Sequence, residues 1–113
     1  MAPPVPNGVS RSAKIMSWAD AYIEKLKAGE TVSFRPRGKS MEPRIKDGQK
    51  VTVSPASVQS LSKGDVVLCQ VGKKQYLHLI KDFKSDRSQF LIGNNRGRIN
   101  GWIGADKIYG KQG

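Results

Sequence analysis

The sequence predicts a mainly β fold built from coiled antiparallel sheets, with one N-terminal amphipathic helix. Apolar residues follow a helical period up to about Ala28, and from residue 31 onward they alternate or form short blocks, as strands do. Turn sequences separate these blocks at short intervals. A length of 113 residues suits one domain. We therefore expect a single domain over residues 12–113, preceded by a disordered tail over residues 1–11.

The helix is expected over residues 12–28. Apolar side chains recur there at spacings of three and four residues: Ile15, Trp18, Ala19, Tyr22, Ile23 and Leu26. This spacing places them on one helix face, which we expect to pack on the domain; docking of a separate partner is the alternative. A serine near the start can cap the helix, and Gly29 follows the last turn.

The β-rich core is expected over residues 31–111. Strands are predicted over residues 31–35, around Val51 and Val53, and over residues 66–71, 76–83, 89–92 and 102–109. Turns containing Gly48, Gly64 and Gly72 precede three of these strands. Many short strands with turns between them are typical of a barrel or sandwich-like domain.

Composition limits the classes of function. Lysine and arginine outnumber aspartate and glutamate by 20 to 9, and the net charge of +11 predicts affinity for a polyanion or an acidic protein partner. No apolar stretch approaches the ~20 residues of a membrane span, so we expect a cytoplasmic protein. The single cysteine, Cys69, is expected to be a buried, reduced thiol. No metal-ligand spacing or phosphate-binding loop occurs, so we expect no metal and no cofactor.

Five segments carry the chemical signal, and the most informative is Arg37-Gly-Lys-Ser-Met-Glu-Pro-Arg-Ile-Lys-Asp-Gly48. The others are Lys63-Gly-Asp-Val-Val-Leu68, Tyr76-Leu-His-Leu-Ile-Lys81, Phe90-Leu-Ile-Gly-Asn-Asn95 and Ile108-Tyr-Gly-Lys111. In this order they resemble the conserved segments of the signal peptidase I and LexA-like serine peptidase superfamily. The histidine in the third segment is similar to that of the endoplasmic-reticulum type of signal peptidase. The resemblance covers residues 31–111 and implies the same fold.

The resemblance implies that Ser40 is a nucleophile and His78 its general base, acting on a peptide or protein substrate. Elementary chemistry agrees, because a serine hydroxyl needs a base to take its proton. His78 is the only histidine, and an ordinary imidazole pKa near 6.5 suits this task. Lys81 lies three residues further along the predicted strand and is expected to face the other side. Without the resemblance, a lone serine and a lone histidine are more often structural.

The group that orients the histidine is less well defined by the sequence. The resembling His-type enzymes have an aspartate in or just after the element that matches residues 90–95. The matching position here is Asn94, and Asn100 nearby is also an amide. We expect Asn94 or Asp106 to orient His78, and an amide stabilises the imidazolium less than a carboxylate does. Gly38 and Met41 are expected to line the substrate pocket; Met41 as a core side chain is the alternative.

Basic residues surround the serine segment and form a predicted basic surface: Arg35, Arg37, Lys39, Arg44, Arg96 and Arg98. Two functions follow from these observations. The first is a soluble serine endopeptidase that uses Ser40 and His78. The second is a catalytically weak or inactive member of the fold that binds nucleic acid or a host protein through its basic surface.

Overall fold

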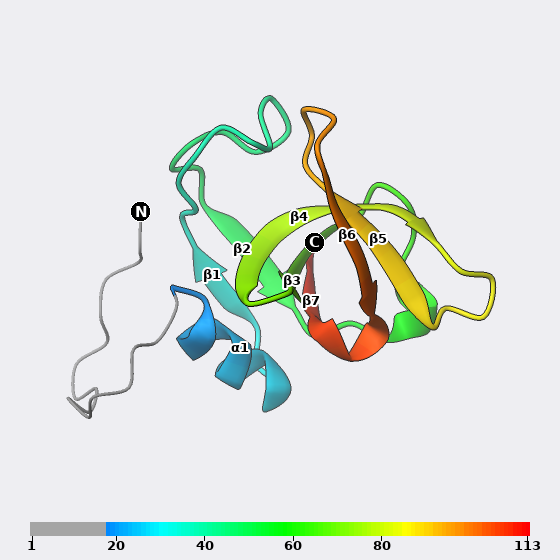
Figure 1. Cartoon of the computed structure of the whole chain (residues 1–113). Coiled ribbons are helices and arrows are strands. Elements are labelled where there is room, and N and C mark those ends of the chain that lie inside the picture. Colours follow the sequence, from blue (N-terminus) through cyan, green and yellow to red (C-terminus); the bar gives the residue numbers. More distant parts are fainter. Residues whose placement is uncertain (1–17) are drawn as a thin grey trace.

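The structure, a computed structural model, describes residues 18–113. It contains one curled antiparallel sheet and one short α-helix, α1 (Asp20–Lys27), which lies beside the sheet (Figure 1). The predicted mainly β class with a helix at its N-terminal side is confirmed. The predicted tail and the expected first helical turns fall outside the described residues. Trp18 and Ala19 form a turn before α1, so the helix begins later than the apolar spacing indicated.

Helix α1 packs on the sheet through its apolar face. Ile23 and Leu26 are buried, and the helix contacts β1 and β7. Gly29 ends the helix with φ of 89°, a left-handed conformation that glycine adopts without strain. Packing of this face on its own domain is therefore the arrangement that the structure contains.

The strands are β1 (Val32–Phe34), β2 (Val51–Ser54), β3 (Val66–Val71), β4 (Lys74–Phe83), β5 (Gln89–Gly93), β6 (Ile99–Gly104) and β7 (Ile108–Gln112). Their order in the sheet is β1-β2-β7-β3-β4-β5-β6. The single strand predicted over residues 102–109 is wrong. The 3-10 turn η2 (Ala105–Lys107) divides it, and β7 then inserts between β2 and β3. Strand β7 therefore joins the N-terminal hairpin to the rest of the sheet.

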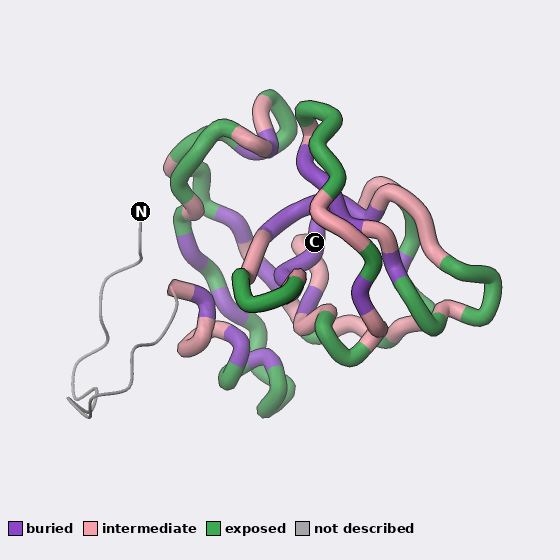
Figure 2. Tube along the Cα trace, in the orientation of Figure 1, coloured by how far each residue is buried: buried purple, intermediate pink, exposed green. Residues whose placement is uncertain are grey.

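The core has two clusters because strand residues alternate between the two faces of the sheet. On β3, Val66 and Leu68 enter the cluster that α1 covers, whereas Val67 and Cys69 enter the second cluster under β5 and β6. Figure 2 shows the buried segments following the middle of the sheet, while the turns at its ends are exposed. Cys69 is a free, buried thiol, as predicted.

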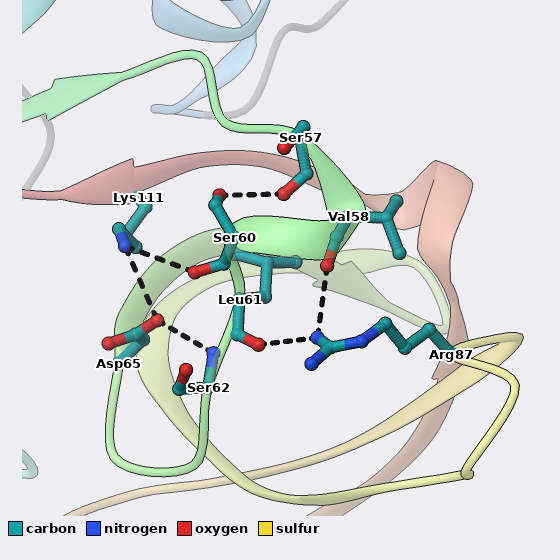
Figure 3. Close-up of polar contacts among 8 residues, drawn as sticks. All are labelled: Ser57, Val58, Ser60, Leu61, Ser62, Asp65, Arg87 and Lys111. Atoms are coloured by element: carbon teal, nitrogen blue, oxygen red, sulfur yellow. Dashed lines mark hydrogen bonds and ion pairs between the residues drawn. The ribbon is translucent and has the colours of Figure 1, made fainter.

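Polar side chains fix the connection between β2 and β3, which contains the 3-10 turn η1 (Val58–Ser60) (Figure 3). The Arg87 guanidinium donates hydrogen bonds to the carbonyls of Val58, at 3.1 Å, and Leu61, at 2.5 Å. Lys111 Nζ lies 3.5 Å from an Asp65 carboxylate oxygen and donates to the Ser60 carbonyl. Side chains from the β4–β5 turn and from β7 thus hold an otherwise irregular segment, whose Leu61 belongs to the second core cluster.

Candidate active site

Ser40 lies in the long β1–β2 connection, residues 35–50, which closes on itself by hydrogen bonds. Gly48 N donates to the Pro36 carbonyl at 2.8 Å, and Gly38 N donates to the Asp47 carboxylate at 2.9 Å. Gly38 has φ of 114°, a conformation that only glycine adopts readily. The glycine two positions before the serine is therefore required by the loop's own geometry.

Two further contacts hold the serine segment against the sheet. The Met41 side chain is buried in the first core cluster, so the residue next to Ser40 is anchored by packing. From the β5–β6 turn, Asn95 N donates to the Ser40 carbonyl and Asn95 Nδ2 donates to the Glu42 carbonyl, each at 3.0 Å. These bonds join two segments that both lie at the top of the molecule in Figure 1. Asn95 was not singled out by sequence reasoning, although it belongs to the resembling Asn-Asn element.

His78 lies on β4, opposite Val67 of β3, and its side chain is 7% exposed. Ser40 Oγ lies 3.2 Å from His78 Nε2, within hydrogen-bonding distance. The structure therefore places the predicted nucleophile and the predicted base side by side, although 38 positions separate them in the sequence. Tyr76, two residues earlier on the same face, stacks on the imidazole with ring centroids 4.8 Å apart.

Asn100 occupies the other side of the imidazole. Its Oδ1 lies 2.7 Å from His78 Nδ1. Because an amide oxygen only accepts hydrogen bonds, Nδ1 carries the proton and Nε2 presents a lone pair to Ser40. The resulting Ser40–His78–Asn100 chain has the connectivity of a catalytic triad with an amide in the place of the acid.

The expectation that Asn94 or Asp106 orients the histidine is wrong. Asn94 Oδ1 instead accepts the backbone N–H groups of Arg96 and Arg98, at 2.8 and 2.9 Å, which uses this oxygen to close the β5–β6 turn. Asp106 lies in the exposed turn η2, after β6 has ended, and within the described residues it forms no hydrogen bond with His78, whose ring nitrogens bond to Ser40 and Asn100. The chain reverses at residues 94–98, so Asn100 on β6 returns to the histidine.

The protonation equilibrium of His78 reflects its surroundings. Burial lowers the pKa of the imidazole below its ordinary value. The Asn100 hydrogen bond opposes this shift, while the positive charges of Arg98 and Lys81 lower the pKa further. The net shift is downward, so His78 is neutral at pH 7 and can accept a proton.

A cleft with a volume of about 690 Å³ opens beside the Ser40–His78 pair. Gly38 and Met41 line this cleft, and Met41 is at the same time a core side chain. Of the predicted basic surface, Arg35, Arg37 and Arg98 line the cleft, whereas Lys39, Arg44 and Arg96 do not. Lys46 and Lys74 are additional basic lining residues. Asn94 also contributes to the wall.

Other nucleophiles and bases near the site are less suited to catalysis. Burial raises the pKa of the Cys69 thiol to about 12, which keeps it protonated and unreactive. The stem of Lys81 lies against Gly93, and a register shift between Ile80 and Asp82 interrupts the strand's regular alternation there. Within residues 18–113, no hydrogen bond joins Lys81 to Ser40. In the same residues, no group of three His, Cys, Asp or Glu side chains is placed to hold a metal ion.

Fold and site together define a peptidase-like domain with a serine beside a histidine. The family model for Peptidase S24-like proteins matches residues 8–98, most of the chain. The chain therefore belongs to the Peptidase S24-like family. No curated protein matches the chain. Among the described residues, no helix is long and apolar enough to cross a membrane.

Proposed function

We propose that the chain is a serine peptidase in which Ser40 is the nucleophile, His78 the general base and Asn100 the group that orients His78. The observation that carries this proposal is the continuous chain of contacts from Ser40 Oγ to His78 Nε2, at 3.2 Å, and from His78 Nδ1 to Asn100 Oδ1, at 2.7 Å. In this arrangement the basic nitrogen faces the nucleophile and the other nitrogen is fixed by an acceptor.

In the first step, Ser40 Oγ forms a bond to the peptide carbonyl carbon while its proton passes to His78 Nε2. The carbonyl oxygen becomes an oxyanion, and the backbone N–H of Ser40, which has no acceptor within residues 18–113, is our candidate donor to it. The C–N bond then breaks, and His78 Nε2–H protonates the leaving amine. Water, deprotonated by the same nitrogen, hydrolyses the acyl-enzyme and releases Ser40.

The edge of β4 supports an extended peptide substrate. Residues 74–78 pair with β3 on one side, whereas pairing with β5 begins only at Leu79. The first half of β4 therefore has an unpaired edge next to His78, where a peptide can add as a strand. Such pairing would hold a carbonyl beside Ser40 without relying on one particular side chain.

A fluorophosphonate probe, read out by intact mass and peptide mapping, tests the proposal. We expect slow labelling of Ser40 at pH 8, loss of labelling in Ser40→Ala and His78→Ala, and unchanged labelling in Ser33→Ala. Ser33 is a suitable control because its hydroxyl lies on the exposed face of β1 and bonds to Thr52. Absence of labelling at Ser40 after prolonged incubation of the folded protein would refute catalysis.

A second candidate function is a binding module without catalysis. The observation that favours it is the amide of Asn100 in the place of a carboxylate, because an amide stabilises the imidazolium less. For this function we expect no probe labelling, no peptide hydrolysis, and ligand affinity that is unchanged by Ser40→Ala. Labelling of Ser40 that depends on His78 would exclude it.

A further inference from the structure

We infer that the cleft selects acidic peptide segments, an inference that rests on the proposed peptidase function and names its substrate class. The basic lining residues are Arg35, Arg37, Lys46, Lys74 and Arg98. Among the described residues, no aspartate or glutamate lines the cleft. The cleft thus carries charge of one sign, although the chain contains nine carboxylate side chains.

The carboxylates nearest in sequence, Asp47 and Glu42, form no ion pair with these cations within the described residues. Asp47 accepts the Gly38 backbone N–H at 2.9 Å, and Glu42 Oε2 lies 3.5 Å from Asp47 N. Both carboxylates are therefore engaged with the backbone of their own loop. The ion pairs of the described residues, Lys63–Asp82 and Lys111–Asp65, involve no residue of the cleft.

Most of the basic side chains in the cleft are available to a ligand. Arg35 donates to the Gly48 carbonyl. In the part of the chain that the structure describes, the charged groups of Arg37, Lys46, Lys74 and Arg98 have no hydrogen bond or ion pair. Their residues are exposed, so their charges are solvated in the free protein and can meet carboxylates without a large desolvation penalty.

The cations belong both to the loop that carries Ser40 and to the strand that carries His78. Arg37 and Lys46 belong to the loop that carries Ser40, whereas Lys74 begins β4, the strand that carries His78. Arg98 lies in the β5–β6 turn and is close enough for its charge to lower the pKa of His78. A peptide in the cleft therefore meets positive charge from the Ser40 loop, from β4 and from the β5–β6 turn.

The apolar part of the lining distinguishes a peptide from a nucleic acid. Phe34 is stacked on Tyr22 and tilted against Trp18, and Tyr76 stacks on His78. These rings already have partners, whereas single-stranded nucleic acid is bound by aromatic faces free to stack on bases. Met41, Ile45 and Leu77 add an aliphatic surface. Aliphatic surface between cations fits a peptide that mixes acidic and apolar residues.

The test measures binding of fluorescent decapeptides to the Ser40→Ala chain, so that it is independent of turnover. The peptides share one apolar sequence with three glutamates, three glutamines or three lysines. Exposed charge pairs change a dissociation constant by roughly 1.5- to 5-fold each. We therefore expect the glutamate peptide to bind on the order of tenfold more tightly than the glutamine peptide at low salt, and the lysine peptide to bind weakest.

Matched variants locate the effect. The triple variant Arg37→Gln, Lys74→Gln, Arg98→Gln is expected to abolish the preference for glutamate, whereas Lys25→Gln, Lys50→Gln, Lys107→Gln is expected to retain it. Both triples remove the same net charge from exposed positions, but only the first lines the cleft.

Three results would overturn the inference: equal affinity for the glutamate and glutamine peptides, equal loss of preference in both triple variants, or tighter binding of an oligonucleotide of the same charge. Preference for the glutamate peptide without probe labelling of Ser40 would refute catalysis alone and support the inference. Probe labelling without any preference would refute the inference alone. The two proposals can therefore fail separately.

Discussion

Replacement of Asn100 by aspartate should increase the reactivity of Ser40. Asn100 Oδ1 lies 2.7 Å from His78 Nδ1, so a carboxylate can take its place with no change in size. The bond to a neutral acceptor contributes about 0.5–1.5 kcal/mol, and one between charged groups about 1.5–3 kcal/mol. The extra stabilisation of the imidazolium is therefore roughly 1–1.5 kcal/mol, which corresponds to about 5- to 13-fold in rate.

The pH dependence gives a second readout. In the proposed mechanism neutral His78 is the base, so activity should decline as the pH falls through its pKa. In the natural chain burial keeps this pKa below its ordinary value, which places the decline below pH ~6.5. A carboxylate at position 100 favours the imidazolium and raises the pKa. On the acidic side of the pH profile (the acid limb), the pH at which the rate falls to half its plateau value is the midpoint. This midpoint should therefore move to higher pH in Asn100→Asp, while the rate at pH 8 increases.

The assay is the rate of fluorophosphonate labelling of Ser40 between pH 5 and 9. The matched control is Asn94→Asp, which makes the same chemical change six residues earlier, in the turn that precedes β6. Asn94 Oδ1 bonds to two backbone N–H groups and not to His78, so we expect the midpoint of the acid limb to stay close to that of the natural chain. A rate and midpoint in Asn100→Asp equal to those of the natural chain would refute the orienting role of Asn100.

Three further predictions follow from individual contacts. Asn95→Ala should lower the labelling rate roughly tenfold with an unchanged pH midpoint, because it loosens the serine segment and leaves His78 untouched; a moved midpoint would contradict this. Arg87→Ala should lower the free energy of unfolding by about 2 kcal/mol, measured in urea, since two hydrogen bonds to carbonyls are lost. Arg87→Gly should lower it less, because φ at this position is 59°; equal losses would argue against backbone strain. The single histidine should titrate by NMR below pH 6.5, and Arg98→Gln should raise its pKa; no change would exclude charge coupling.

Several elements could be predicted from sequence because neighbouring residues determine them. The apolar run Val66 to Val71 and the turn at Gly72 define the β3–β4 hairpin, whose two strands pair directly. The apolar spacing of Ile23 and Leu26 identifies the buried face of α1. The serine segment was also recognisable by its resemblance to the family's segments, and the φ of 114° at Gly38 shows why the loop needs a glycine there.

The tertiary structure alone decided the order of the strands and the third member of the site. Insertion of β7 between β2 and β3 depends on contacts across the whole chain, which local patterns do not encode. Sequence pointed to an amide or acid near residue 94, but backbone N–H groups of the turn use Asn94, and the β5–β6 register brings Asn100 to His78. The sequence thus determined which kinds of side chain are available, and the pairing of strands decided which of them reaches the histidine.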